Sequence, residues 1–146
     1  CYVAGDFEKA EKMNRQLVKI TTVVNLLVSL GVVFARKPLV GIFTDSELII
    51  GLALGIFVVD IITEQARAVS QVYEYALRAT GDVLCPVIVL TISCWVCSIG
   101  LAYFLAMRCR MGLIGCWIGL AADESFRAIF TYLRWKKGGW KQASKG

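Results

Sequence analysis

The chain has 146 residues, of which 58% are hydrophobic and 18% charged, and its formal net charge is +5. A soluble globular domain is about 45–50% apolar and about 25% charged, so this composition excludes a water-soluble enzyme core, a disordered chain and a secreted disulfide scaffold. Histidine is absent, which removes most imidazole metal sites and the Ser-His and Cys-His nucleophile pairs. We expect a membrane protein that is not an enzyme and that has no catalytic residues, cofactor or bound metal.

Four uncharged apolar runs account for the high hydrophobic content. The run 83–107 has 25 residues, more than the about 20 that a transmembrane helix needs, and the run 20–35 has 16. Two further runs, 48–59 and 111–122, each stop after 12 residues at a carboxylate. No linker or repeat divides the chain, so we expect 1–146 to form a single unit. The predicted fold class is all-α, a polytopic integral membrane protein with four transmembrane helices.

The first helix is predicted over about 7–36. Gly5-Asp6 is typical of a helix start, with Asp6 as the N-cap residue. The helix is expected to end at Arg36-Lys37-Pro38, because the residue before a proline is disfavoured in the α region.

The second helix is predicted over about 46–79, with Thr44 or Asp45 capping its first turn. At 1.5 Å per residue this helix would be about 50 Å long, whereas the hydrocarbon core of a bilayer is about 30 Å thick. We therefore expect either a bend or an interfacial first part, with Gly51 or Gly55 as the place of the change.

The third and fourth helices are predicted over about 82–107 and 111–133. Asp82 is the expected N-cap of the third helix, and Pro86 is tolerated near its start. A basic tail, 134–146, follows the fourth helix. Its tryptophans stand beside lysines, a combination typical of the membrane–water interface.

The basic residues are divided unequally between the two sides of the predicted bundle. Four spans place both termini and the middle connection on one side, and basic residues favour the cytoplasm. We therefore expect both termini to be cytoplasmic, the lipid bilayer to be a partner, and nucleic acid not to be one. The first side holds Lys9, Lys12, Arg15, Lys19, Arg67, Arg78, Arg127, Arg134, Lys136, Lys137, Lys141 and Lys145, and the other holds Arg36, Lys37, Arg108 and Arg110.

A polar stripe runs along one face of the second predicted helix. Its members follow one another at spacings of 3 or 4, which places them on the same side of a helix. An ionised group facing lipid costs about 2.5–3.5 kcal/mol or more, so the stripe should line a cavity or pair with other helices. The stripe consists of Asp60, Glu64, Arg67, Gln71, Glu74 and Arg78.

Within this stripe, Glu64–Arg67 and Glu74–Arg78 can neutralise each other, which leaves Asp60 without a cation on its own helix. We expect Asp60, Glu64, Arg67 and Gln71 to line a substrate or ion cavity. The alternative is that the part 64–80 emerges from the membrane, so that its charges form a solvated face.

The fourth predicted helix carries Asp123-Glu124-x-x-Arg127. Arg127 can reach Asp123 four positions away and Glu124 three positions away. Cation-coupled transport needs a buried carboxylate whose protonation depends on solvation and on nearby charge. These three residues are therefore a second candidate polar site, and an intrahelical salt bridge near the interface is the alternative.

Two Gly-x-x-x-Gly patterns, Gly51/Gly55 and Gly115/Gly119, allow close approach between helices. We expect them to serve packing within the chain rather than dimerisation.

Short motifs in a fixed order give the chain a family resemblance. It resembles the carboxy-terminal half of a bacterial multidrug and toxic compound extrusion (MATE) transporter over nearly all of its length. The matching stretches are Gly5-Asp6 with Ala10, Phe43-Thr44-Asp45-x-Glu47, Leu77-Arg78-Ala79-Thr80-Gly81-Asp82, Leu101-Ala102-Tyr103, Gly112-Leu113-x-Gly115-x-Trp117-x-Gly119, Asp123-Glu124-x-x-Arg127, and Arg134-Trp135 with Gly138 and Trp140.

The resemblance implies a parent protein of twelve helices in two six-helix lobes, in the bacterial inner membrane. The present chain would be a fragment of it, helices nine to twelve. Such a protein exports drugs or toxic organic compounds in exchange for Na⁺ or H⁺ by alternating access. The implied partners are a small organic substrate and the missing amino-terminal part, without which we expect no transport.

The chain departs from the family at Arg67. In several members that position carries a coupling acid, and an arginine cannot bind and release a coupling cation. Coupling would then use Asp60, Glu64 or the other lobe, or the ligand preference would shift towards anions. Arg67 leaves one alternative function open, a lipid-linked oligosaccharide flippase of the same superfamily. A second alternative, independent of Arg67, is a self-contained four-helix membrane protein.

Overall fold

The computed structural model describes residues 7–138 and 140, and these residues are helical with no strand among them. The predicted all-α class is therefore confirmed. The elements in chain order are α1 (Phe7–Phe34), α2 (Arg36–Gly41), α3 (Glu47–Ala79), α4 (Leu84–Ser93), the π-helical stretches η1 (Cys94–Leu101) and η2 (Phe104–Arg108), and α5 (Gly112–Lys136).

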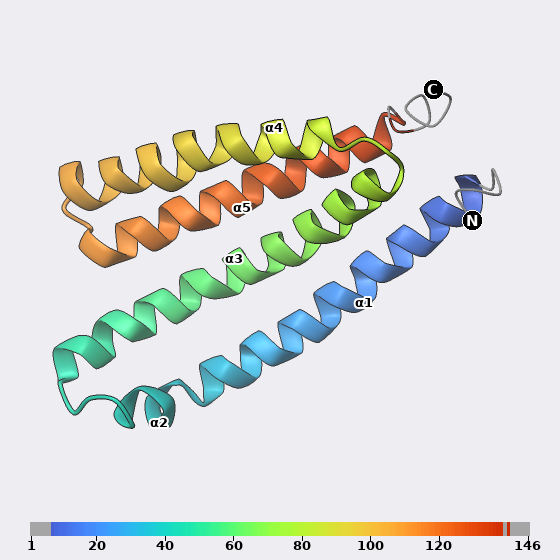
Figure 1. The fold of residues 1–146 in the computed structure, drawn as a ribbon. Coiled ribbons are helices and arrows are strands. Elements are labelled where there is room, and N and C mark those ends of the chain that lie inside the picture. The colour runs from blue at the N-terminus through green and yellow to red at the C-terminus, as the bar shows by residue number, and fades with distance from the viewer. Residues whose placement is uncertain (1–6, 139, 141–146) are drawn as a thin grey trace.

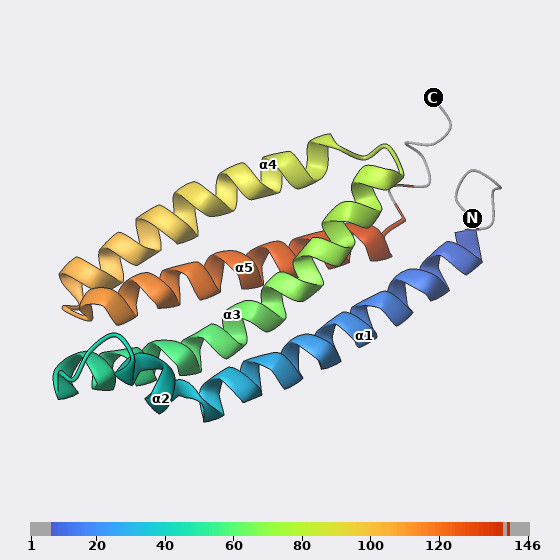
Figure 2. The same ribbon diagram turned by 60° about the horizontal axis from the view of Figure 1, so that its bottom comes forward.

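The long helices run up and down beside one another (Figures 1 and 2). Helix α3 lies in the middle and packs against both α5 and α1. The helices α4, η1 and η2 follow one another as a single rod that packs along α5. The beginning of α1 and the end of α5 lie at the same end of the bundle (Figure 1).

Two helical segments are long and apolar enough to cross a membrane, Glu8–Phe34 and Leu84–Arg108. Helices α3 and α5 have 33 and 25 residues, so at 1.5 Å per residue each exceeds the about 30 Å of the hydrocarbon core. In α3 and α5 charged residues interrupt the apolar stretches, whereas α1 carries its charges only in its first half. Several of the charged residues of α3 and α5 are buried inside the bundle. Most large apolar side chains of the described residues lie on the outside.

Helix α3 runs through Gly51 and Gly55 without a break, and Figure 2 shows it as a curved, continuous rod. Helix α3 is therefore not interrupted at either glycine, and the expected bend or interfacial first part at Gly51 or Gly55 stays a prediction. The end of the first helix also differs from the prediction. Helix α1 ends at Phe34, before Arg36-Lys37-Pro38, and Pro38 lies inside the short helix α2. A proline in the first turn needs no backbone N–H partner.

The helix caps differ from those predicted. The N-cap of α4 is Val83, which makes no side-chain cap bond, so the prediction for Asp82 is wrong. Asp82 instead accepts a hydrogen bond of 2.8 Å from Nε of Arg134 at the end of α5. At α3 the hydroxyl of Thr44 accepts from the amide of Ser46, the N-cap residue, at 3.2 Å. Asp6 lies outside the described residues.

Gly115 and Gly119 bring α5 into close contact with the η1–η2 rod. A Cβ atom on Gly119 would lie 2.6 Å from Cβ of Ala102, and one on Gly115 would lie 2.8 Å from the amide nitrogen of Ala106. Internal packing is thus confirmed for this pair. Gly51 has nothing within 4 Å of such an atom, and Gly55 meets only Ile114 at 3.4 Å.

A compact aromatic core closes the end of the bundle where α5 finishes. Tyr73 and Leu77 of α3 pack there against Trp135 and Trp140. The two indole rings are stacked with centroids 4.4 Å apart, and Nε1 of Trp140 donates to the carbonyl of Trp135 at 3.0 Å. Both tryptophans are therefore buried in the chain, and their place at the membrane–water interface stays a prediction.

Candidate functional site

Arg67 stands between two carboxylates that come from different helices. Its Nη1 pairs with Glu64 on the preceding turn of α3, as the spacing predicted. Its Nε donates to Oε1 of Glu124 on α5 at 3.2 Å. The 3- and 4-residue spacing places these side chains on one face of α3, and the packing of the helices turns that face towards α5. The contact between Arg67 and Glu124 therefore links the two predicted sites.

Arg127 is a second junction, on α5. Its Nη2 donates to Oδ2 of Asp123 at 3.3 Å and to Oε1 of Glu124 at 2.5 Å. Its Nη1 lies 4.0 Å from Oε1 of Glu74 on α3. Both predicted intrahelical pairs of Arg127 are therefore confirmed, and Glu74 is an additional partner.

The ion pairs form one connected set, which we call the acid–base network. Its outer end is the predicted pair of Glu74 and Arg78, whose Nη2 lies 3.5 Å from Oε2 of Glu74. The set extends across α3 and α5, so the two sites predicted as separate are continuous. The network consists of Glu64, Arg67, Glu74, Arg78, Asp123, Glu124 and Arg127.

Burial varies along the acid–base network. The side chains of Asp123 and Glu124 are only 8% and 9% exposed, and that of Glu74 is 11% exposed. Arg67 and Arg78 are 40% and 39% exposed. Glu74 therefore does not belong to a solvated face, and the alternative suggested for the end of the stripe does not apply to this residue.

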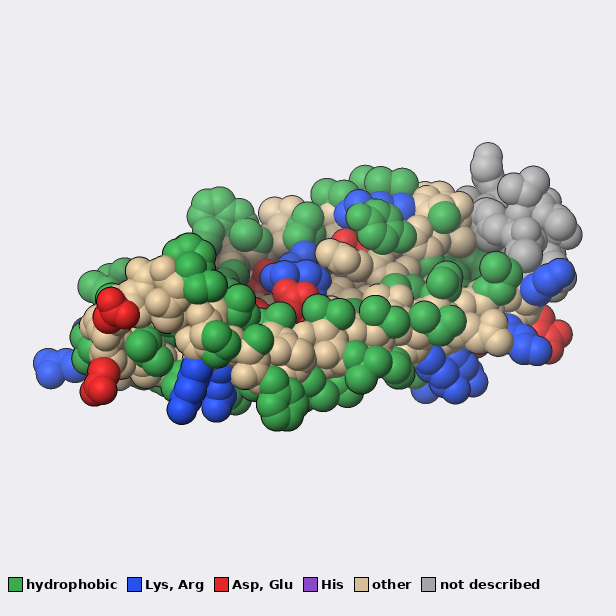
Figure 3. All heavy atoms as spheres, turned by 90° about the horizontal axis from the view of Figure 1, so that it is seen from below, with side chains coloured by type: hydrophobic (Ala, Val, Ile, Leu, Met, Phe, Trp, Pro, Cys, Tyr) green, Lys and Arg blue, Asp and Glu red, His purple; other side chains and the backbone are tan. Residues whose placement is uncertain are grey.

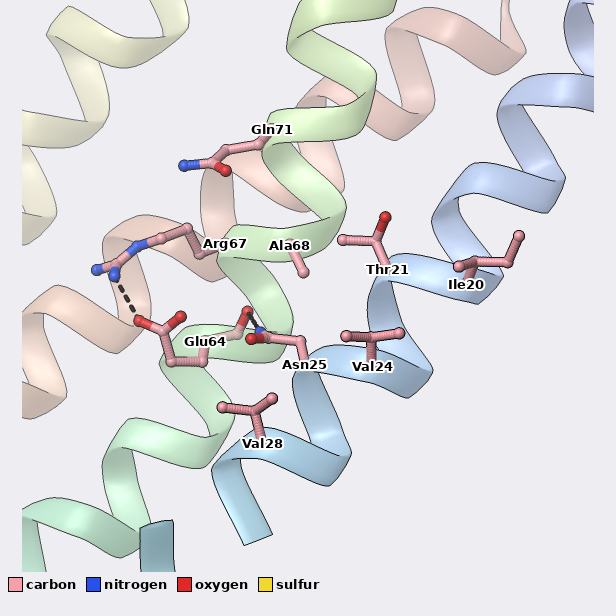
Figure 4. Close-up of a pocket in the computed structure, with 9 residues that line it drawn as sticks. All are labelled: Ile20, Thr21, Val24, Asn25, Val28, Glu64, Arg67, Ala68 and Gln71. Atoms are coloured by element: carbon pink, nitrogen blue, oxygen red, sulfur yellow. Dashed lines mark hydrogen bonds and ion pairs between the residues drawn. The ribbon is translucent and has the colours of Figure 1, made fainter. Parts of the chain in front are cut away.

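A cavity of about 390 Å³ lies between α1 and α3, with Glu64, Arg67 and Gln71 in its wall. Figure 4 shows the carboxyl group of Glu64 and the guanidinium group of Arg67 pointing away from α1. A neighbouring cavity of about 210 Å³ shares Glu64 and adds Asp60. All four residues predicted for the cavity thus line one or other of two adjoining hollows. The face of the molecule drawn in Figure 3 shows acidic and basic side chains together in a recess that apolar side chains surround.

The sequence analysis missed a polar contact from α1. Nδ2 of Asn25 donates to the backbone carbonyl of Glu64 at 2.7 Å, and Asn25 lines both cavities. It is an amide inside the uncharged run 20–35. A polar group in a lipid-spanning segment is costly, and that position alone could have marked Asn25.

The charge balance decides which ligands the site favours. The acid–base network and Asp60 together contain five carboxylates and three guanidinium groups. The guanidinium group of Arg67 is already shared by two carboxylates, so it is poorly available to an anion. A recess with excess negative charge and apolar walls attracts cations. Among residues 7–138 and 140, no group of three or more acidic or thiol side chains is placed to hold a metal ion.

Comparison with known proteins gives relatives for most of the chain. The sequence model of the family MatE matches residues 1–104. The chain is 39% identical over 106 residues to a protein of Bacillus subtilis named as an uncharacterized transporter, YisQ. It is 31% identical over 112 residues to a probable multidrug resistance protein, NorM, of Thermotoga maritima. Each of these alignments covers 73% of the present chain.

A eukaryotic relative aligns over more of the chain. The multidrug and toxin extrusion protein 1 of Pongo abelii is 25% identical over 139 residues, or 92% of the chain. The aligned part makes up only 23% of the two bacterial proteins and 24% of the Pongo protein. The chain therefore spans about a quarter of the length of these relatives. No solved structure matches it.

Proposed function

The chain belongs to the MatE family of membrane transporters, and we propose that it is part of a secondary antiporter that exports drugs or toxic organic cations in exchange for Na⁺ or H⁺. The chain is the carboxy-terminal part of that protein, with α1, α3, the α4–η2 rod and α5 as four of its transmembrane helices. The missing amino-terminal part completes the translocation pathway, and alternating access moves the substrate. The protein resides in the bacterial inner membrane with both termini in the cytoplasm.

The observation that carries this proposal is the excess of carboxylates around the recess between α1 and α3. A buried ionisable residue in a membrane helix marks a substrate or ion pathway. Asp60 makes no ion pair among the described residues, and together with Glu64 it provides the negative charge that an organic cation or a coupling ion needs. Gln71 and the apolar residues of α1 supply polar and apolar contacts to the body of the substrate. The names of the relatives support a toxic compound as cargo.

The flippase alternative is less favoured by the same geometry. A lipid-linked oligosaccharide carries a pyrophosphate, which a cavity recognises with unpaired cations. Arg67 was the residue that kept this alternative open, and its guanidinium group is engaged by Glu64 and Glu124.

The proposal is tested by drug susceptibility in a bacterial strain that lacks its own major efflux pumps. We expect the full-length protein to raise resistance to cationic dyes and drugs more than to anionic compounds. Asp60→Asn should reduce that resistance about tenfold, the factor that corresponds to about 1.4 kcal/mol of lost interaction. Asp45→Asn, in the exposed segment before α3, is the matched control and should leave resistance unchanged.

Two results would count against the proposal. Resistance that is unchanged by the full-length protein for every cationic compound would exclude drug export. Equal resistance with Asp60→Asn and wild type, at equal abundance in the membrane, would exclude the recess as the binding site.

A further inference from the structure

We propose that the chain has a binding site for an anionic phospholipid, on the face of α3 that points away from the recess. A basic hollow at one end of the bundle takes the phosphate headgroup, and an apolar groove between α3 and α5 takes an acyl chain. The charged residues of this site are distinct from those of the recess and of the acid–base network, so the lipid is a further ligand beyond the proposed function.

The hollow has a volume of about 350 Å³ and lies where the first part of α1 passes α3 and α5. Its walls carry three basic side chains, Arg15 and Lys19 on α1 and Lys136 on α5, and one acidic side chain, Glu11. None of the three basic residues forms an ion pair with another described residue. The hollow thus has an excess of two positive charges, which attracts a phosphate group.

Aromatic rings form the inner wall of the hollow. Tyr73 of α3 and Tyr132 of α5 meet edge to face with ring centroids 5.5 Å apart, and the ring of Trp135 lies 6.3 Å from that of Tyr73. All three rings line the hollow. Tyrosine and tryptophan are enriched where a membrane meets water, because each ring has an apolar body and a polar tip. Cations beside such rings suit the headgroup region of a bilayer.

The position of the hollow along the helices fits the surface of a membrane. The uncharged run 20–35 of α1 begins directly after Lys19, and Lys136 is the last residue of α5. The beginning of α1 and the end of α5 lie at the same end of the bundle (Figure 1). Long basic side chains at the end of an apolar stretch extend towards the headgroups, so they can reach the phosphates of the adjacent leaflet.

An apolar groove of about 500 Å³ adjoins the hollow. It lies between α3 and α5, and Tyr132 lines both the groove and the hollow. Its walls are mostly aliphatic, with Ile62, Ala66 and Val69 on α3 and Ile129 on α5. Ile62 and Ile129 are 60% and 62% exposed, so the groove is open along its side and an acyl chain can enter it from the bilayer.

The groove and the recess lie on different faces of α3. At 3.6 residues per turn, Ala66 and Val69 point to one side of the helix, whereas Arg67 and Gln71 point to the other. A lipid in the groove therefore leaves the recess free for another ligand.

A phospholipid fits the hollow and the groove together better than other occupants do. A soluble phosphate ion would use the basic hollow and leave the groove empty, whereas every methylene group buried in the groove adds to the affinity of a lipid. A helix of the amino-terminal part could cover the groove, but its apolar side chains would not neutralise the three cations. A phosphate in the hollow also joins α1 to α5, which both pack on α3.

The test uses the purified full-length protein in detergent, depleted of co-purified lipid. Native mass spectrometry measures the binding of cardiolipin (two phosphates), phosphatidylglycerol (one phosphate) and zwitterionic phosphatidylcholine, and the Tm is recorded with each. The anionic lipids should bind at least about tenfold more tightly than phosphatidylcholine, a difference expected from their charge, with cardiolipin the tightest. They should also raise the Tm, because a ligand of the folded state stabilises it. Inorganic phosphate should leave the Tm unchanged.

Two variants test the two parts of the site separately. Arg15→Gln with Lys19→Gln should weaken the binding of anionic lipids about thirtyfold, or about fivefold for each charge removed, and leave that of phosphatidylcholine unchanged. Ala66→Phe fills the groove and should weaken the binding of every lipid. Lys37→Gln with Arg108→Gln, at exposed positions of α2 and η2, removes the same two residue types elsewhere and should bind as wild type.

Three results would overturn the lipid site. The first is equal affinity of wild type for anionic lipids and phosphatidylcholine, or equal affinity of wild type and Arg15→Gln with Lys19→Gln for anionic lipids. The second is a Tm that inorganic phosphate raises as much as cardiolipin does, which would indicate a site for a free anion. The third is a wild-type protein that binds no lipid, which would indicate that the amino-terminal part covers the groove.

Discussion

Arg67 is the residue at which the two halves of the site meet. Its planar guanidinium group donates from Nη1 to Glu64 and from Nε to Glu124, a two-partner geometry that a lysine ammonium group cannot reproduce with the same directions. The carboxylate of Glu124 is almost fully buried. Arg67 thus links α3 to α5 through Glu124, and it also contributes a positive charge to the wall of the cavity.

Arg67→Ala should therefore destabilise the protein. Removing one partner of a buried ion pair costs about 3–5 kcal/mol, but Arg67 is 40% exposed and solvent screening reduces the figure to about 1–2 kcal/mol. Thermal unfolding of the purified full-length protein in detergent measures the change as a lower Tm. Arg67→Lys should fall between Ala and wild type.

Lys37→Ala, at an exposed position of α2, is the matched control for the loss of a positive charge. A Tm of Arg67→Ala equal to that of this control would contradict the two-helix role of Arg67.

At the residue scale, the sequence predicted contacts within a helix but not contacts between helices. The spacing of Glu64, Arg67, Asp123, Glu124 and Arg127 predicted each contact within a helix, because three- and four-residue spacings fix neighbours on a helical surface. The contact from Arg67 to Glu124 could not be predicted this way. It depends on how α3 and α5 are rotated towards each other, which packing decides.

At the scale of the elements, the rotation of α5 about its axis is set by close contacts between its glycines and the η1–η2 rod. Helix α5 places Gly115 and Gly119 against the η1–η2 rod. A Cβ atom on Gly119 would lie 2.6 Å from Cβ of Ala102, which is closer than non-bonded carbon atoms pack in proteins. Such small-residue contacts hold membrane helices together through van der Waals packing. They fix the face that α5 turns to α3, and with it the position of Glu124.

Gly119→Ala should lower the stability of the bundle, while Gly51→Ala should not. Alanine is favoured over glycine in a helix by about 1 kcal/mol, and that gain is realised at Gly51, where nothing lies within 4 Å. At Gly119 the added methyl group forces the rod away from α5, and overpacking costs about 1–3 kcal/mol. Unfolding in detergent should show a lower Tm for Gly119→Ala and an unchanged or higher Tm for Gly51→Ala. The reverse order would contradict the packing.

The helix ends explain where local sequence signals fail. Asp82 has the residue type and position of an N-cap, yet it pairs with Arg134, 52 positions away in the chain. A cap bond from Asp82 would also be charge-assisted, but the pair with Arg134 adds the attraction of a full positive charge, so the tertiary contact prevails over the local one. A pattern read within a few residues carries no information about such a partner.

At the scale of the whole molecule, the composition predicted an all-α membrane protein, and the fold and the family agree with that prediction. The chain spans about a quarter of the length of its relatives, so its orientation and its part in transport stay predictions. The apolar exterior of α1 and the polar recess beside it divide the surface into a part suited to lipid or further helices and a part suited to a cationic ligand.

The most direct test of the central claim is transport by the purified full-length protein in proteoliposomes. A fluorescent organic cation is followed across the bilayer, with and without an opposing H⁺ or Na⁺ gradient and without ATP. The account predicts that the gradient drives substrate uphill, that an ionophore abolishes this movement, and that Asp60→Asn slows it about tenfold while Glu47→Gln does not. Substrate movement at the same rate with and without either gradient, or only with ATP, would contradict it.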